Sequence, residues 1–195
     1  MNSTEDIQNG EALRGWIVPV GGAEEKVSDP KILRRFARVA GEDQARIAII
    51  PTASQLDETG GRYEAVFREL GVASAVSLPY RERSDAERED WLEVLDSATG
   101  VFFTGGNQLR ISTILGGTQV ITRIRRLNRR GVAVGGTSAG AAIMPEHMIA
   151  HGQVGATPLA GMVSLAPGLG LTNRFLIDQH FRERDRLGRL LCALS

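Results

Sequence analysis

The sequence has few of the features that mark secreted, membrane or nucleic-acid-binding proteins. Its 195 residues include one cysteine, Cys192, so no intrachain disulfide can form, which is compatible with a cytoplasmic setting. No apolar run approaches the roughly 20 residues of a membrane helix, and the acidic start lacks the apolar core of a signal peptide. The formal net charge is zero, so nothing suggests a polyanion-binding surface. We therefore expect a cytoplasmic protein without membrane or nucleic-acid partners.

The remaining composition is that of one globular domain. Hydrophobic residues make up 42% of the chain and charged residues 24%, which are ordinary proportions for such a domain. Residues 1–14 are polar and predict a flexible leader. Residues 15–195 predict a single domain that is long enough to bury a sizeable core.

Short apolar runs alternate with segments of helical periodicity along the chain. The predicted strands are residues 16–20, 46–50, 72–78, 100–103 and 131–134. The predicted helices are residues 30–40, 63–70, 85–95 and 118–130, with another from about 109. Such alternation implies right-handed crossovers, and it predicts a three-layer α/β sandwich around a mostly parallel sheet.

Glycine-rich loops follow three of the predicted strands, at residues 21–26, 104–108 and 135–140. In parallel sheets, ligands bind beyond the carboxyl ends of the strands. We therefore expect the three loops to face one cleft.

The third loop contains the pattern of a nucleophile elbow, Gly136-x-Ser138-x-Gly140. In an elbow, a serine lies on a tight turn between strand and helix, where glycine avoids a clash as the backbone reverses. The Ala139 amide, at the predicted start of the helix, can point at a developing oxyanion. The alternative is a glycine-rich turn without catalytic function, which this pattern alone does not exclude.

A serine nucleophile needs a base, and the chain has three histidines: His147, His151 and His180. If the helix after Ser138 continued, His147 would lie about 13 Å further along its axis, too far to serve. His147 and His151 are four residues apart, but no third ligand cluster accompanies them, so we expect no metal site. His180 lies in an apolar, strand-like run, residues 175–181, and remains as the candidate base.

Four arginines follow His180: Arg182, Arg184, Arg186 and Arg189. They fit either a solvated helix face or a wall that binds substrate carboxylates. Residues 147–177 contain no Asp or Glu, and neither Glu146 nor Asp178 is well placed. The α/β-hydrolase order of serine, acid and histidine is therefore disfavoured, and we expect the acid after residue 180.

Together, four stretches of the chain resemble the cyanophycinases of peptidase family S51. The stretches are residues 21–26, 102–111, 135–141 and 177–181 with the arginines that follow. The resemblance implies a class I glutamine amidotransferase-like (flavodoxin-like) fold, a homodimer and no cofactor. It also implies hydrolysis of cyanophycin, a poly-aspartate backbone with arginine on each β-carboxyl, to β-aspartyl-arginine dipeptides.

By the same resemblance, Ser138 is the nucleophile and His180 the general base, and the Gly106 and Ala139 amides form the oxyanion hole. The positions that match residues lining the substrate site are Gln108, Asp178, Gln179, Arg184, Arg186 and Arg189.

One departure from the family pattern concerns the acid of the triad. In the family it is a glutamate after the arginine-rich helix, and no residue here matches it. We expect that the chain is C-terminally incomplete, exposes apolar surface and is much less active than a full-length relative. Alternatively, Glu24, Glu25 or Glu183 orients the base. Two other functions remain open: a dipeptidase for other aspartyl or isoaspartyl peptides, and a catalytically impaired binding domain.

Overall fold

The computed structural model describes residues 14–195, so nearly all of the expected leader lies outside the described residues. Five parallel strands form the central sheet, in the order β1-β5-β4-β2-β3. They are β1 (Ile17–Val20), β2 (Arg46–Ile50), β3 (Ser74–Ser77), β4 (Gly100–Phe103) and β5 (Ala133–Thr137). All five predicted strands are therefore confirmed, and each lies parallel to its neighbours.

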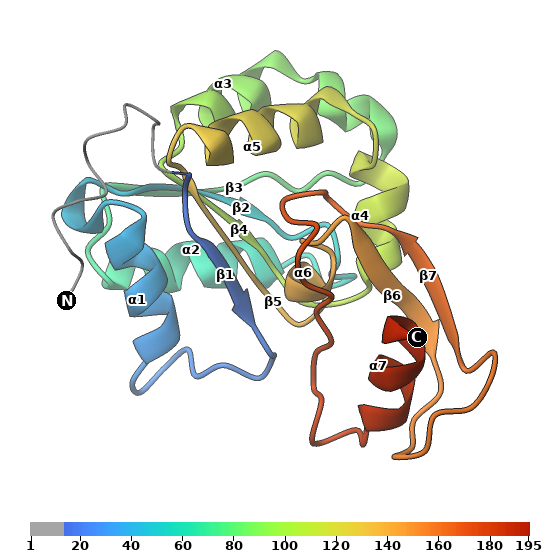
Figure 1. The fold of residues 1–195 in the computed structure, drawn as a ribbon. Helices are drawn as coiled ribbons and strands as arrows, with labels where there is room; N and C mark the ends of the chain where they lie inside the picture. The colour runs from blue at the N-terminus through green and yellow to red at the C-terminus, as the bar shows by residue number, and fades with distance from the viewer. Residues whose placement is uncertain (1–13) are drawn as a thin grey trace, which may run out of the picture.

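Helices cover both faces of this sheet (Figure 1). One face carries α1 (Lys31–Val39) and α2 (Thr59–Glu69), and the other carries α3 (Glu89–Ser97) and α5 (Gln119–Arg129). The helix α4 (Gln108–Leu115) follows β4. The single helix expected over residues 85–95 is divided, because a 3₁₀ turn at Arg83–Glu87 precedes α3. The three-layer prediction is confirmed.

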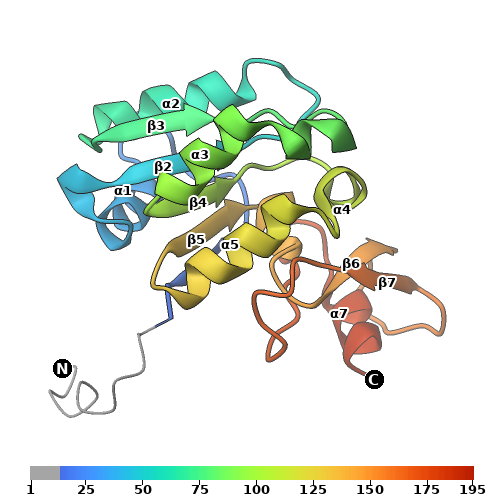
Figure 2. The ribbon, with the colours of Figure 1, turned by 90° about the horizontal axis from the view of Figure 1, so that it is seen from above.

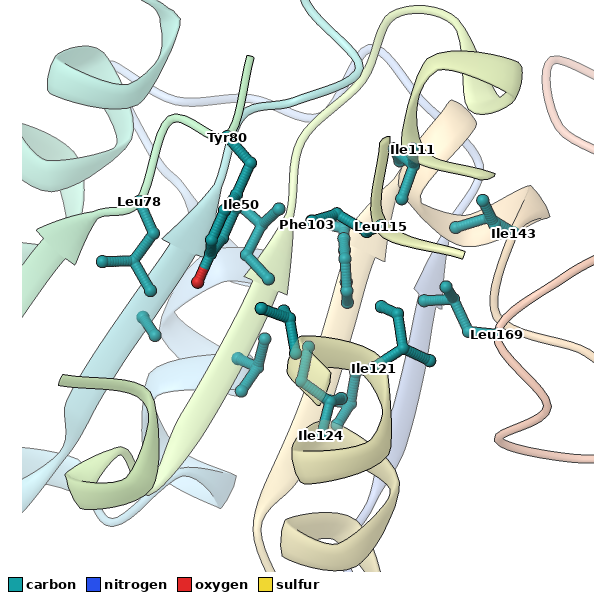
Figure 3. Packing of buried hydrophobic residues seen from close by; sticks show 14 of the residues in the cluster. Ile50, Leu78, Tyr80, Phe103, Ile111, Leu115, Ile121, Ile124, Ile143 and Leu169 are labelled. Carbon is teal, nitrogen blue, oxygen red and sulfur yellow. The ribbon is translucent and has the colours of Figure 1, made fainter. Parts of the chain in front are cut away.

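Each face of the sheet has its own apolar core. Under α1 and α2, the rings of Phe36 and Phe67 pack edge-on or tilted against Phe102, with centroids 5.1 and 5.5 Å from it. Figure 3 shows the opposite core, where Phe103 of β4 packs among side chains of α4 and α5. Neighbouring residues of β4 thus point to opposite cores, as the period of a strand requires.

The part of the chain after Ser138 differs from the predictions in three respects. The helix α6 (Ala139–Ala142) ends after four residues, so the assumed continuation to His147 is wrong. His147 instead begins β6 (His147–Gly152), which pairs antiparallel with β7 (Val163–Pro167). Residues 175–181 form no strand and run as irregular chain. The last helix, α7 (Leu187–Leu194), lies beside this hairpin (Figure 2).

Apolar surface is exposed next to β1, which is an edge strand. A cavity of about 570 Å³ opens between β1 and the irregular segment, and it is lined mainly by apolar side chains such as Ile17, Leu176 and Phe181. Phe175 at its rim is 68% exposed. This agrees with the expectation of exposed apolar surface. Among residues 14–195, no helix is both long and apolar enough to cross a membrane.

Candidate active site

Ser138 lies at the sharp turn between β5 and α6, at the carboxyl end of the sheet. Its backbone has φ 53° and ψ −111°, a sparsely populated conformation for a residue with a side chain. Such a conformation costs on the order of 1–3 kcal/mol and persists only where the surroundings hold it. The Ser138 N–H donates to Val20 O at 2.9 Å, which ties the turn to the end of β1. The geometry is that of a nucleophile elbow.

Two glycines of the pattern are required by close backbone packing. A Cβ on Gly136 would lie 2.6 Å from Gly140 O, and a Cβ on Gly140 would lie 2.4 Å from Phe103 O. Both distances are shorter than a side chain tolerates. The glycine spacing therefore allows α6 to pack directly against the ends of β5 and β4.

The three glycine-rich loops meet at this edge of the sheet, as predicted, because residues of all three line one cavity. A Cβ on Gly105 would lie 3.4 Å from Ser138 Cβ, so the loop after β4 is in contact with the elbow. Gly106 has φ +141°, and a Cβ there would lie 2.1 Å from Ala53 O. Only glycine fits this position, where the loop after β4 crosses the loop after β2.

Two backbone amides are free beside the serine. In residues 14–195, neither the Gly106 N–H nor the Ala139 N–H donates a hydrogen bond to a protein acceptor. Ala139 is the first residue of α6, where N–H groups lack an intrahelical partner. These are the two amides that the sequence assigns to an oxyanion hole.

The structure brings His180 to Ser138, with 3.0 Å between Nε2 and the serine Oγ. The loop after β1 holds the histidine on its other side: the His180 N–H donates to Gly21 O at 3.0 Å. A Cβ on Gly22 would lie 2.4 Å from Cε1 of the imidazole, so the ring packs against bare backbone. His180 itself has φ 49°. This loop thus determines where the imidazole lies.

The environment favours the neutral form of His180. Partial burial, followed by the positive charges of Arg184 and Arg186, places its pKa below the ordinary histidine value. A neutral imidazole with a free Nε2 lone pair can accept the Ser138 proton. The Ser138 hydroxyl also lies 3.3 Å from Gln179 Oε1, a second acceptor for the same hydrogen. Among the described residues, no carboxylate accepts a hydrogen bond from His180 Nδ1.

Of the residues predicted to line the substrate site, Gln179 lies beside Ser138, and the other five differ in their surroundings. Asp178, whose side chain is 2% exposed, forms ion pairs with Arg186 and Arg189, whose side chains are each 7% exposed. Gln108 Nε2 donates to Ile149 O at 3.0 Å, so this amide holds β6. Arg184 is exposed. Of the predicted arginines, therefore, only Arg184 has its guanidinium in solvent.

A buried polar network next to the elbow was not predicted. Glu24 accepts hydrogen bonds from the hydroxyls of Tyr63 and Thr137, the residue directly before the serine. Its side chain is 1% exposed and also pairs with Lys26 Nζ at 2.9 Å. Tyr63 could have been suspected as a site residue from its position in the sequence. It lies early in the helix after β2, and that helix begins at the edge of the sheet where the glycine loops lie.

The two other histidines take no part in the site. His147 and His151 are exposed on β6. In the described part of the chain, no three His, Cys, Asp or Glu side chains are grouped so that they could hold a metal ion.

Comparison with known proteins places the chain in a family. The model of peptidase family S51 matches residues 17–193. The chain is 44% identical over 185 residues to a cyanophycinase of Geminocystis herdmanii, covering 94% of this chain and 68% of that protein. It is 42% identical over 192 residues to a cyanophycinase of Trichormus variabilis, covering 97% of this chain and 64% of that protein. A third cyanophycinase, from Synechococcus elongatus, is 42% identical over 184 residues, which cover 93% of this chain and 57% of the relative.

Solved structures share the fold at lower identity. A peptidase from an acI-B1 Actinobacterium superposes with a TM-score of 0.69 at 21% identity, over 89% of this chain and 71% of that chain. A protein described as a putative peptidase E from Listeria monocytogenes gives a TM-score of 0.59 at 15% identity, over 93% and 88% of the two chains. The match over residues 17–193, together with these relatives, shows that the chain belongs to peptidase family S51.

Proposed function

We propose that this chain carries the catalytic centre of a serine exopeptidase that hydrolyses cyanophycin to β-aspartyl-arginine dipeptides. The chain spans 57–68% of the length of the cyanophycinases described above, so the activity of the whole protein is inferred from them. The observation that carries the proposal is the 3.0 Å contact between Ser138 Oγ and His180 Nε2 on a strained elbow. Strain of this kind accumulates at functional sites.

The proposed reaction is acyl transfer through Ser138. His180 Nε2 takes the hydroxyl proton as Oγ attacks the scissile carbonyl carbon, and the Gly106 and Ala139 amides donate to the resulting oxyanion. The protonated imidazole then gives its proton to the leaving amine, which leaves an ester on Ser138. Water attacks that ester while His180 accepts one of its protons, and the imidazolium then gives this proton to Ser138 Oγ as the acid product leaves.

The decisive experiment compares Ser138→Ala with wild type on cyanophycin. We expect the substitution to lower kcat by at least about 10⁴-fold, because the nucleophile and base act as a unit. Ser97→Ala is the matched control, since Ser97 lies on α3 and its exposed hydroxyl donates to Val94 O within the same helix. Hydrolysis by Ser138→Ala at the wild-type rate would refute the proposal.

A binding domain without turnover is the second candidate, and it is favoured by the absence, among residues 14–195, of a carboxylate bonded to the imidazole. Labelling with a fluorophosphonate separates the two functions. Covalent modification of Ser138 supports the peptidase, whereas an unreactive Ser138 in a folded protein supports the binding domain. Rates on cyanophycin and on aspartyl dipeptides distinguish the polymer-specific enzyme from a dipeptidase.

The cellular location and oligomeric state of the protein are proposed from composition and family resemblance. We propose that the protein works in the cytoplasm, in keeping with its single cysteine. We also propose a homodimer, on family resemblance alone. Light scattering of the purified protein measures the oligomeric state.

A further inference from the structure

The cavity that contains Ser138 is lined by three charged side chains, of which the sequence suggested a role only for Glu24, as an alternative acid for the base. Its volume is about 310 Å³. The loop after β1 contributes Glu24 and Lys26, and the first turn of α2 contributes Arg62. Glu24 is the one acidic residue among the described residues that line this cavity. The charge balance of the lining is therefore positive.

Glu24 is ionised, but its burial keeps it out of reach of a ligand. Burial alone would raise its pKa, but hydrogen bonds from Thr137, Tyr63 and Lys26 outweigh burial, and its pKa lies below the ordinary value. The carboxylate is enclosed by these three donors, with its side chain 1% exposed. The buried Glu24 carboxylate therefore fixes the position of the Lys26 ammonium and does not itself contact a ligand in the cavity.

The two cations retain donors that can reach a ligand in the cavity. Lys26 Nζ uses one hydrogen on the Glu24 carboxylate and one on Glu24 O at 3.1 Å, which leaves the third free. Arg62 is 69% exposed and contacts Glu58 through Nη2 alone, at 3.2 Å. The rest of its fork of N–H groups faces solvent or ligand. By contrast, Arg186 and Arg189 are buried against Asp178.

We infer that Lys26 and Arg62 bind a free carboxylate of the substrate beside Ser138. The inference rests on the proposed function, because each β-aspartyl-arginine unit carries a free arginine α-carboxylate. A guanidinium and an ammonium that share one cavity suit that group, since charge-assisted hydrogen bonds to carboxylates are about twice as strong as neutral ones. This site thus supplies the carboxylate recognition that one of the two interpretations of the arginine series had placed on the arginines after His180.

The test measures binding separately from catalysis. Calorimetry on Ser138→Ala compares a peptide of three β-aspartyl-arginine units with the same peptide bearing arginine carboxamides. We expect the carboxylate form to bind about 10-fold tighter or more, the range of one or two hydrogen bonds to charged groups. Adding Lys26→Met or Arg62→Gln to Ser138→Ala removes most of this preference. The inference is overturned if the preference survives both substitutions, or if Ser138→Ala binds neither peptide.

Two controls keep the result specific. Arg38→Gln removes an exposed arginine of α1 that is likewise paired with a glutamate four residues away, Glu42 in the 3₁₀ turn after the helix, and it leaves the preference intact. Lys26→Arg retains the positive charge over Glu24 and restores the preference. Because Lys26→Met leaves Glu24 buried without a cation, Arg62→Gln is the variant that tests the inference with the buried network unchanged.

Failure of this inference can be distinguished from failure of the proposed function. If wild type hydrolyses cyanophycin and the carboxylate preference is unchanged in Lys26→Met and Arg62→Gln, the proposed enzyme stands and this site is wrong. If the preference depends on the cations but Ser138 neither reacts nor hydrolyses, the site stands as a binding site and the peptidase is wrong.

Discussion

Ser138 and His180 lie 3.0 Å apart at their reacting atoms, yet the parts of the chain that hold them differ in construction. Ser138 follows a fully buried strand, and α6 packs on that strand through glycine backbone. His180 lies in an irregular segment between the β6-β7 hairpin and α7 (Figures 1 and 2). The proposed nucleophile is thus held by regular structure, whereas the proposed base is held by a loop.

Polar contacts take the place of close packing around the base. Asp178, two residues before His180, is buried between Arg186 and Arg189. The Arg186 guanidinium also donates to Gln179 O, and Gly21 O accepts the His180 N–H. The comparison predicts that removing a buried charge should loosen the segment that carries His180, and that added volume should act where backbone packs closely, at the glycines of the elbow and at Gly22 beside the imidazole.

The largest expected effect comes from Asp178→Asn. The change leaves two buried guanidinium groups without their counter-charge, and breaking a buried pair in this way typically costs about 3–5 kcal/mol. We expect the segment from residue 173 onward to loosen and hydrolysis to fall with it, while the five-stranded sheet remains folded. Hydrogen exchange by region, measured alongside activity, checks this.

The control for that change is Asp185→Asn, an exposed aspartate in the same segment. Its φ of 45° is a conformation that asparagine also tolerates. We expect near wild-type exchange and activity. If Asp178→Asn slowed hydrolysis without faster exchange after residue 173, the base would not depend on the ion pairs as argued.

A smaller and more local effect is expected from Gly22→Ala. The added Cβ would lie 2.4 Å from the His180 ring, and φ +116° disfavours a side chain. Displacing the imidazole by about 1 Å typically costs on the order of 10²-fold in rate. We expect kcat/KM to fall by that factor, with a modest loss of thermal stability.

Gly21→Ala is the matched control, because a Cβ there meets nothing within 4 Å. Steady-state kinetics of both variants, with thermal melts, measure the difference. Equal activity of the two alanine variants would mean that the loop after β1 does not position the base.

The same comparison explains how much the sequence could predict. Strands such as 46–50 and 100–103 were found because they are short, continuous apolar runs, and their order of alternation with helices dictates the parallel sheet. The elbow is predictable because its glycines are required where backbone segments lie too close together for any side chain to fit. These are local signals that survive without knowledge of the tertiary structure.

The C-terminal part lacked such signals. The apolar run 175–181 suggested a strand, but within residues 14–195 no strand pairs with it, and its apolar side chains line the cavity next to β1. Arg186 and Arg189 are polar in sequence but buried in the structure, because their charges meet Asp178. Such pairing depends on which residues the fold brings together. The role of Tyr63 in enclosing Glu24 was missed for the same reason.

The smallest expected effect is a shift in the pH dependence of kcat/KM when a charge near His180 is removed. The pKa of His180 is lowered by partial burial and then by Arg184, while Glu183 and Glu24 act in the opposite direction. Only neutral imidazole can accept the serine proton, so kcat/KM should fall as pH drops through that pKa, below the ordinary histidine value. Arg184→Gln removes a positive charge and raises the pKa, so the fall should begin at a higher pH.

The pH profile of Arg184→Gln is best compared with that of Arg182→Gln. Arg182 is exposed in the same segment but is not among the groups that shift the pKa of His180. Because Arg184 is exposed, salt screens its charge, and the displacement between the two profiles should shrink as ionic strength rises from about 0.01 to 1 M. Identical profiles at low salt would show that the charge of Arg184 does not reach the base. The position of the acid limb would then be set by burial of the imidazole and by Arg186, whose charge is fixed in place by Asp178.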